Sequence, residues 1–220
     1  MIHFASKIEL EEKLTAAIAT NLKTAITERG KATLLLSGGS TPGGVYRLLS
    51  QVELNWSKVV VGLVDERFVG PDSEFSNHLL IQNTLLQNKA QAAQFVPMVS
   101  NPNDYAKNLE EIEAAYRIFT EPDVVLLGMG PDGHTASIFP NDAASDLALH
   151  GKSQLIFNTN APAHPTQRIT CSAALLCRSR NLLLMLTGAQ KLTVFETAAT
   201  NNLPIAAFQN HIDQIYYTAS

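Results

Sequence analysis

The sequence has few cysteines and no long apolar run. Cys171 and Cys177 are the only cysteines in 220 residues, which is too few for a disulfide framework and leaves no second pair for a zinc site. We interpret both as ordinary core thiols. No apolar run is long enough to cross a bilayer, and residues 1–4 do not form the basic segment that precedes the apolar part of a secretory signal. We therefore expect a cytoplasmic protein with no membrane partner.

The sequence also lacks an excess of positive charge. Its 16 Lys and Arg residues against 20 Asp and Glu residues give a formal net charge of -4, and it has no basic run of the kind that neutralises a nucleic-acid backbone. We expect no nucleic-acid partner, so any anionic ligand must be bound by local groups. Hydrophobic residues make up 45% of the chain, which is enough for a sizeable core and excludes a disordered chain.

Helical and apolar segments alternate along the chain. Residues 6–29 carry apolar side chains at every fourth position and are followed by Gly30, which predicts an amphipathic helix. That row is Leu10, Leu14, Ile18, Leu22 and Ile26. Buried strands are predicted at 32–36, 58–64, 123–127 and 181–186, and weaker ones at 95–99, 154–158, 168–172 and 214–218. Because the strong runs show no polar alternation, the sequence predicts an α/β fold with a mainly parallel sheet covered by helices on both faces, in one domain over residues 1–220.

A glycine-rich loop, residues 37–42 (Ser-Gly-Gly-Ser-Thr-Pro), follows the first of these strands. Thr41 suits the N-cap of a helix and Pro42 its first position. The buried side of that helix would carry Val45, Tyr46, Leu48 and Leu49. Free backbone N–H groups at a helix N-terminus bind anions, and the hydroxyl groups of Ser37, Ser40 and Thr41 would add donors, so this glycine loop could hold a phosphate. It has neither the lysine of a Walker sequence nor the third glycine of a dinucleotide fingerprint. The alternative is a tight turn in which glycine supplies a positive φ.

A charged triplet, residues 65–67 (Asp-Glu-Arg), directly follows the valine-rich run 58–64. Polar groups at the carboxyl end of a buried strand are where α/β enzymes place catalytic residues, although surface turns carry such triplets too. Downstream, Ser76 and Asn77 would cap a helix over residues 77–86. We favour a functional role for the triplet.

A longer polar loop, residues 128–140, leaves the apolar run 123–127, and we name it the central loop. Ligands of an open α/β sheet bind outside the carboxyl ends of its strands, so this loop lies where a substrate would bind. His134 can take and return a proton near neutral pH, and Asp132 could orient the imidazole ring if the loop folds back on itself. The alternative is a turn that carries a solvated histidine.

Lys191 lies in the first turn of the helix predicted after the run 181–186. A cation there is unfavourable against the helix dipole, and a bound phosphate would offset the cost. The other titratable residues have simpler interpretations. We read His78 as helix surface, His164 as part of an exposed turn, and three acidic residues of the helix predicted at 102–119 as a solvated face, namely Glu110, Glu111 and Glu113.

Three motifs together resemble the 6-phosphogluconolactonase family over nearly the whole chain. They are Ser-Gly-Gly-Ser-Thr-Pro at 37–42, Asp-Glu-Arg-Phe-Val at 65–69 with Ser-Asn at 76–77, and Gly-Pro-Asp-Gly-His-Thr-Ala-Ser-Ile-Phe-Pro at 130–140. The resemblance implies the sheet shared with sugar-phosphate isomerases and deaminases. It also implies hydrolysis of a small-molecule substrate, 6-phosphoglucono-1,5-lactone, to 6-phosphogluconate in the pentose phosphate pathway, with no cofactor and no metal. We expect a monomer or a small homo-oligomer.

Lactone hydrolysis needs a base to activate water, a stabiliser for the oxyanion, an acid for the ring oxygen and a site for the phosphate. His134 would serve as base and then as acid. Arg67 would polarise the carbonyl or hold substrate, while Asp65 and Asp132 would set hydroxyl contacts and orient the imidazole. As in the family that the chain resembles, the phosphate would lie against Ser37, Gly38, Gly39, Ser40, Thr41, Arg168 and Lys191.

Two other classes of protein share these motifs in part. Glucosamine-6-phosphate deaminases carry a glutamate just before the final proline of the corresponding loop, where this chain has Phe139, and an aromatic residue after Asp-Glu, where it has Arg67. The other class is a non-catalytic sugar-phosphate sensor, in which this fold is joined to a DNA-binding module. Because the chain has no appended helix-turn-helix and no basic patch, we favour a lactonase over both.

Overall fold

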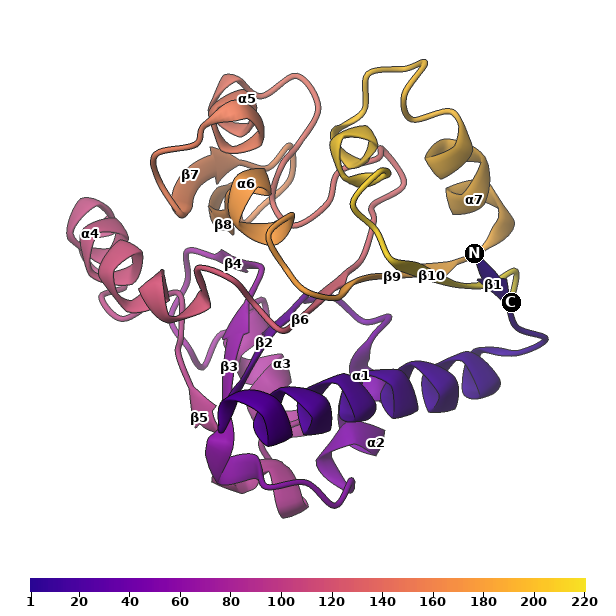
Figure 1. Cartoon of the computed structure of the whole chain (residues 1–220). Coiled ribbons are helices and arrows are strands. Elements are labelled where there is room, and N and C mark those ends of the chain that lie inside the picture. The colour runs from indigo at the N-terminus through magenta and orange to yellow at the C-terminus, as the bar shows by residue number, and fades with distance from the viewer.

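Ten β-strands form two sheets in the computed structural model, which describes residues 1–220 (Figure 1). The larger sheet has the strand order β1-β10-β9-β6-β2-β3-β5, and all its neighbouring strands are parallel. Its strands are β1 (Ile2–His3), β2 (Ala32–Leu36), β3 (Val59–Leu63), β5 (Gln94–Phe95), β6 (Val124–Leu127), β9 (Leu182–Thr187) and β10 (Gln214–Thr218). The predicted α/β fold with a mainly parallel sheet is confirmed.

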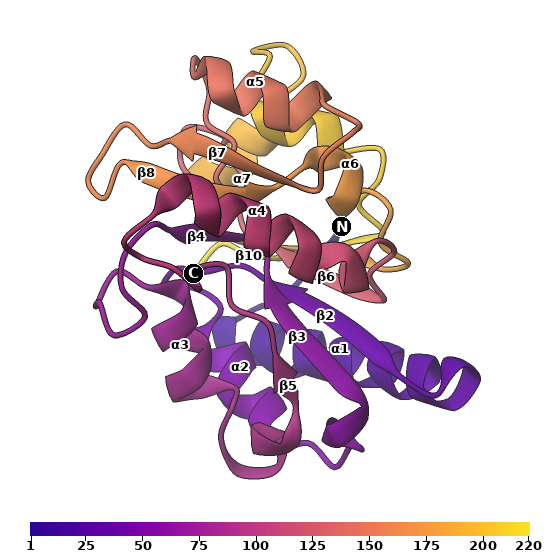
Figure 2. The ribbon, with the colours of Figure 1, turned by 90° about the vertical axis from the view of Figure 1, so that its left-hand side faces the viewer.

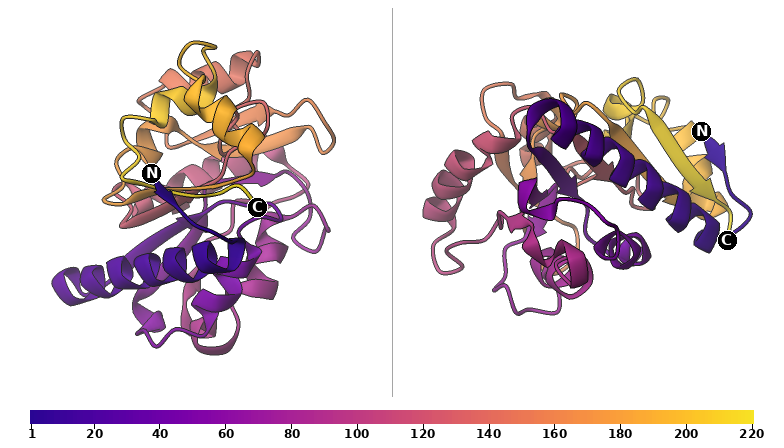
Figure 3. Two further views of the ribbon diagram at one scale, coloured as in Figure 1. Left: turned by 90° about the vertical axis from the view of Figure 1, so that its right-hand side faces the viewer. Right: turned by 60° about the horizontal axis from the view of Figure 1, so that its bottom comes forward.

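Helices lie on both sides of this sheet. They are α1 (Lys7–Arg29), α2 (Gly43–Ser50), α3 (Asn77–Thr84), α4 (Tyr105–Ala115), α5 (Ala143–His150), α6 (Ala173–Leu176) and α7 (Ala189–Glu196), with 3-10 helices η1 (Trp56–Lys58), η2 (Asn88–Ala92), η3 (Tyr116–Phe119) and η4 (Pro204–Phe208). In Figure 1, α1 and α2 lie together below the sheet and α7 lies above it. Figure 3 shows the two chain ends close together, where β1 pairs with β10. No helix is both long enough and apolar enough to span a membrane.

Helix α1 forms as its pattern predicts. The Ser6 hydroxyl accepts a hydrogen bond from the backbone N–H of Glu9, and Gly30 ends the helix with a φ of 75°. The apolar row of Leu10, Leu14, Ile18 and Leu22 is fully buried. Because four residues exceed one turn of about 3.6 residues, the row winds around the helix, and Ala25 rather than Ile26 is buried at its end.

Helix α2 begins later than predicted. Its cap is Pro42, whose carbonyl accepts the first helical hydrogen bond, and no side chain caps the helix, so the predicted role of Thr41 as N-cap is wrong. Leu48 is 40% exposed instead of buried, because it lies at the edge of the helix face that packs inward. The large buried side chains of α2 are Val45, Tyr46 and Leu49.

Other predicted elements differ in their bounds. Helix α3 ends at Thr84, and the helix predicted at 102–119 begins at Tyr105, where the Asp104 side chain caps it, and continues beyond Ala115 as the 3-10 helix η3. The strand predicted at 95–99 is reduced to the two residues of β5. Strand β1, which is also only two residues long, was not predicted because so short a segment has no readable period.

The second sheet is small and antiparallel. It has the order β4-β8-β7, with β4 (Asp65–Arg67), β7 (Ile156–Asn160) and β8 (Gln167–Cys171), and lies above the large sheet in Figure 2. The chain passes from one sheet to the other at Val64. Its N–H donates to the carbonyl of Leu36 in β2, while its carbonyl accepts from the N–H of Cys171 in β8. The sequence predicts strands close to β7 and β8 but not this separate sheet.

The interpretation of Glu113 as a solvated residue is wrong. Its carboxylate accepts hydrogen bonds from the backbone N–H groups of Leu155 and Ile156, at 3.0 and 2.9 Å, and so anchors the start of β7 to α4. His78 is half-buried, with its ring centroid 4.7 Å from that of Phe95. His164, which was expected in an exposed turn, is exposed.

Candidate active site

A cavity of about 410 Å³ lies where the carboxyl ends of β2, β6 and β9 meet the small sheet. Every candidate site residue taken from the sequence lines it. These residues are Ser37, Gly38, Gly39, Ser40, Thr41, Asp65, Arg67, Asp132, His134, Arg168 and Lys191. Residues that are far apart in the sequence are thus brought to one place, as expected for loops that leave the same edge of a parallel sheet.

His134 and Asp132 form a close pair within the central loop. His134 Nδ1 lies 2.5 Å from Asp132 Oδ1, which also accepts the backbone N–H of His134 at 3.2 Å. Gly130 makes room for this fold-back, because a Cβ atom there would lie 2.1 Å from His134 Cε1. Burial alone would raise the pKa of Asp132, but the hydrogen bonds from His134, and the charge of its ring when protonated, outweigh burial and lower that pKa. An ionised Asp132 holds the imidazole by Nδ1 and leaves Nε2 as the nitrogen available for chemistry.

Phe139 packs between the histidine and one of the arginines. Its ring centroid lies 4.7 Å from that of His134, and the guanidinium carbon of Arg168 lies 5.9 Å from the same centroid. The Phe139 backbone N–H donates to the Ser145 hydroxyl at 2.9 Å, which fixes this end of the central loop. An apolar ring therefore occupies the position where the deaminases carry a glutamate.

Arg67 and Arg168 are direct cross-strand partners in β4 and β8. Arg67 Nη1 donates to the carbonyl of Phe75 at 2.5 Å, and Arg168 Nε donates to that of Pro165 at 2.8 Å. The buried Arg67 Nε has no hydrogen-bond partner. Burial lowers the pKa of Arg168, and the charge of Arg67 lowers it further. Neither arginine has a carboxylate partner, so an anion in the cavity would stabilise both.

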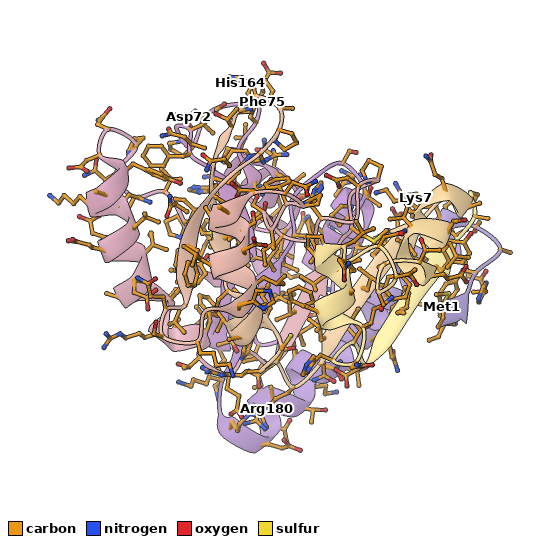
Figure 4. The ribbon with its side chains drawn as sticks, turned by 90° about the horizontal axis from the view of Figure 1, so that it is seen from above. Met1, Lys7, Asp72, Phe75, His164 and Arg180 are labelled. Atoms are coloured by element: carbon orange, nitrogen blue, oxygen red, sulfur yellow. The ribbon has the colours of Figure 1, made fainter.

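The loops held by these arginines meet at their exposed tips. Phe75 and His164 lie side by side at the edge of the molecule in Figure 4, with ring centroids 6.1 Å apart. The hairpin that carries His164 also supplies residues 161–163 to the cavity lining. Arg168 thus holds the hairpin that lines the cavity, and Arg67 holds the loop that meets this hairpin at Phe75.

Lys191 supplies a third cation from helix α7. Its Nζ donates to the carbonyl of Met129 at 2.7 Å, which turns the side chain toward the central loop. Burial lowers the pKa of Lys191, and the nearby charge of Asp132 partly opposes this shift. A charged lysine in this half-buried position would be stabilised further by a bound anion.

The glycine loop presents backbone donors to the cavity. The N–H groups of residues 38–41 make no backbone hydrogen bond and lie at the N-terminal end of α2. The Ser37 hydroxyl is already engaged, since it donates to the Leu126 carbonyl at 2.8 Å and accepts the N–H of Gly128 at 3.1 Å. Gly38 packs so closely on Asn77 that a Cβ atom would lie 1.8 Å from the Asn77 side-chain oxygen. The free donors are thus the amides and the hydroxyls that follow Ser37.

Two residues of the charged triplet line the cavity, and the third stabilises the fold. Asp65 and Arg67 line the cavity, whereas Glu66 is 1% exposed and accepts four hydrogen bonds. Their donors are the backbone N–H groups of Arg67, Asn77 and His78 and the Ser76 hydroxyl. Burial raises the pKa of Glu66, although the backbone donors oppose the rise. Glu66 is an anchor between β4 and α3.

Some residues that line the cavity were not assigned from the sequence. They include Asn77, Met129, Ser137 and Met185. Asn77 and Ser137 stand within the family motifs, which is the signal that could have marked them. The methionines carry no such signal, because nothing in a sequence separates a core methionine from one at the wall of a cavity.

The comparisons with known proteins agree on one family. The model for glucosamine-6-phosphate isomerases/6-phosphogluconolactonase matches residues 5–217. A 6-phosphogluconolactonase of Mesorhizobium japonicum is 39% identical over 197 residues, which cover 89% of this chain and 83% of that protein. One of Neisseria meningitidis is 33% identical over 214 residues, covering 94% and 93%. The chain belongs to the 6-phosphogluconolactonase family. The resemblance carried by the three motifs is therefore confirmed.

Solved structures of the 6-phosphogluconolactonase family share the fold. The crystal structure of a 6-phosphogluconolactonase from Shewanella baltica matches with a TM-score of 0.91 at 36% identity, over 98% of this chain and 95% of that one. A monomeric glucosamine-6-phosphate deaminase matches with a TM-score of 0.78 at 19% identity. That second likeness concerns the fold alone.

Proposed function

We propose that the protein hydrolyses 6-phospho-D-glucono-1,5-lactone to 6-phospho-D-gluconate in the oxidative pentose phosphate pathway, with His134 as the general base. Relatives named 6-phosphogluconolactonase, at 39% and 33% identity over most of both chains, support the reaction. The observation that carries the mechanism is the pair of His134 and Asp132, 2.5 Å apart, beside a cavity with three cations.

The reaction begins with the activation of water. His134 Nε2 takes a proton from a water molecule as its oxygen attacks the lactone carbonyl carbon, while the Asp132 carboxylate stabilises the imidazolium that forms. The carbonyl becomes a tetrahedral oxyanion. When that intermediate collapses, the bond between C1 and the ring oxygen breaks and His134 returns the proton to the ring oxygen, which becomes a hydroxyl. One water is consumed, and the product is a carboxylic acid that ionises at neutral pH.

The cations divide between the two ends of the substrate. Arg67 is the group we assign to the carbonyl oxygen, because it lines the cavity, has no carboxylate partner and carries a permanent charge. The phosphate would lie among the amides of the glycine loop, Arg168 and Lys191. Charge-assisted contacts of this kind are shorter and stronger than neutral hydrogen bonds.

Deamination of glucosamine 6-phosphate is not favoured. In the deaminases a glutamate completes a carboxylate–histidine pair, and here Phe139 places an apolar ring 4.7 Å from the His134 ring. Such a ring can neither accept nor donate the proton that the carboxylate would carry.

The experiment is to incubate the protein separately with 6-phosphogluconolactone and with glucosamine 6-phosphate, following acid release and ammonia release. We expect enzyme-dependent acid release from the lactone, above its spontaneous hydrolysis, and no ammonia above background. Enzyme-dependent ammonia would assign the protein to the deaminases, and binding without either product would assign it to the sensors.

A further inference from the structure

The carboxylate of Asp65 is buried in the cavity wall without a cation. Asp65 is 7% exposed, and its carboxylate forms no ion pair. Its backbone carbonyl accepts a hydrogen bond from Asn77 Nδ2 at 2.9 Å, which fixes the main chain at the start of β4. A buried carboxylate is costly unless hydrogen bonds compensate it, so the donors that reach its two oxygens decide what it does.

Ser137 supplies the only protein donor to that carboxylate. Its hydroxyl donates to Asp65 Oδ2 at 2.5 Å, across 72 positions of sequence. Asp65 Oδ1 has no hydrogen-bond partner in the protein and is not among the sealed polar atoms. Both residues line the cavity. One oxygen of the carboxylate is therefore committed to the protein, and the other is open to a donor from the cavity.

Ser137 itself is held rigidly by the small sheet. It is 0% exposed. Its carbonyl accepts the Thr159 hydroxyl of β7 at 2.6 Å, and its N–H donates to the Thr170 hydroxyl of β8 at 3.3 Å. The central loop is thus fastened to the sheet that also carries Asp65, Arg67 and Arg168, so the direction of the Ser137 hydroxyl is set before any ligand binds.

We propose that Ser137 is a positioning residue, which holds Asp65 Oδ2 so that Asp65 Oδ1 accepts a hydrogen bond from a hydroxyl group of the bound sugar lactone. This inference rests on the proposed function. The arginines, Lys191 and the loop amides that we assign to substrate are all donors. A polyhydroxylated ligand also needs acceptors, and a carboxylate oxygen with no protein partner is a strong one. The other carboxylate of the cavity, Asp132, is already bonded to the His134 imidazole.

The test compares Ser137→Ala with the wild-type protein. Without the Ser137 donor, Asp65 loses its fixed orientation, and we expect kcat/KM for the phosphorylated lactone to fall about tenfold or more. The affinity for 6-phosphogluconate, measured by calorimetry, should fall by a similar factor. Inorganic phosphate, which has no sugar hydroxyl, should bind the variant within about twofold of the wild-type affinity. Equal weakening of phosphate and 6-phosphogluconate would overturn the proposal, as would an unchanged kcat/KM.

Two further variants separate positioning from folding. Ser172→Ala also removes a buried hydroxyl, the one that caps α6, and should leave both affinities unchanged. In an Asp65→Asn background, Ser137→Ala should add no more than about a twofold loss, because Ser137 acts through Asp65. Full additivity of the two losses would overturn the proposal. If Ser137→Ala does not fold, Ser137→Cys keeps the volume with a weaker donor and should show the same selective loss.

The proposed function can fail independently of this inference. If the wild-type protein does not hydrolyse the lactone, the proposed reaction is wrong. The selective loss of 6-phosphogluconate affinity in Ser137→Ala tests hydroxyl recognition alone. Hydrolysis by the wild-type protein, together with unchanged 6-phosphogluconate binding by the variant, would remove only the role of Ser137.

Discussion

The two sheets of this protein differ in what their strands carry. Strands β2, β3 and β6 of the large sheet are buried at every position and almost entirely aliphatic. The small sheet instead buries charged and hydroxyl-bearing side chains in β4, β7 and β8, namely Asp65, Glu66, Thr159, Arg168 and Thr170. The large sheet supplies most of the core and a row of loops at its carboxyl edge. The small sheet positions charge against that edge, and the cavity lies where the two meet.

The difference also separates two ways of holding a structure together. Packing of aliphatic side chains is non-directional, so the large sheet tolerates changes that preserve volume. The small sheet depends on directed hydrogen bonds, such as the four that Glu66 accepts. We therefore expect even small substitutions in the small sheet to change the activity and the local structure strongly.

The largest effect should come from the loop between the two sheets. His134→Ala should lower kcat for the lactone by about 10² to 10⁴, the usual contribution of a general acid–base group. The fold should be intact, because this histidine contributes little to the core. Steady-state kinetics, corrected for spontaneous hydrolysis, give kcat.

Phosphate binding is the control for His134→Ala. Its dissociation constant, measured by calorimetry, should stay within a few-fold of the wild-type value, since the variant keeps all three cations. Turnover close to that of the wild-type protein would remove His134 from the mechanism.

The second largest effect should come from the proposed phosphate contacts, to which each of the two sheets would contribute one cation. Arg168→Ala removes the cation of the small sheet, and Lys191→Ala removes the one that follows the large sheet. Each should cost about 1.5 to 3 kcal/mol, or roughly ten- to over a hundredfold in kcat/KM, mainly through KM. Steady-state kinetics of each variant, with the phosphorylated and with the unphosphorylated lactone, measure these losses.

The unphosphorylated lactone distinguishes a phosphate contact from general damage. Its hydrolysis should scarcely change in either variant, because it has no phosphate to lose. Equal losses for the two lactones would show that these cations serve another part of the reaction.

The same contrast explains how much of the molecule could be predicted from its sequence. The strands of the large sheet are readable because each is an unbroken apolar run, as at 32–36 and 181–186. The small sheet is not, because β4 consists of three charged residues and its pairing with β8 joins Asp65 to Thr170, far along the chain. Local patterns carry no information about such a long-range register.

The candidate site, too, could be predicted from sequence only where local patterns determine it. Residues in loops directly after apolar strands could be predicted to line one cavity, and they do so. Their individual roles stay predictions. The contact of Ser137 with Asp65 could not be foreseen, because it depends on how the central loop packs on β7 and β8. The exact cap of α2 was missed for a smaller reason, since Thr41 and Pro42 are both acceptable at a helix start.

A moderate effect on stability should follow from loosening the small sheet at Glu66. In Glu66→Gln an amide NH₂ replaces one carboxylate oxygen, and it must then face two donors. We expect the free energy of unfolding at neutral pH to fall by about 1 to 3 kcal/mol, as for unsatisfied buried donors. Urea denaturation measures the change. The control is Glu110→Gln, on the exposed face of α4, which should change the free energy of unfolding by less than about 0.5 kcal/mol. A Glu66→Gln variant as stable as the wild-type protein would contradict the role of Glu66 as an anchor.

The smallest effect concerns pH and the cation that follows the large sheet. Burial lowers the pKa of Lys191 below its ordinary value of 10.5. Between the lowered and the ordinary pKa the unfolded chain binds more protons at this lysine, so its contribution to stability rises with pH across that window.

Phosphate binding should depend on the same lysine. A bound phosphate favours the charged lysine, so the affinity for phosphate falls as pH passes the lowered pKa. Calorimetry over the alkaline range up to about pH 10.5 should show phosphate affinity falling as pH rises in the wild-type protein. Lys191→Arg, whose charge is permanent, should show a flatter profile, and parallel profiles for the two proteins would exclude Lys191 from the phosphate site.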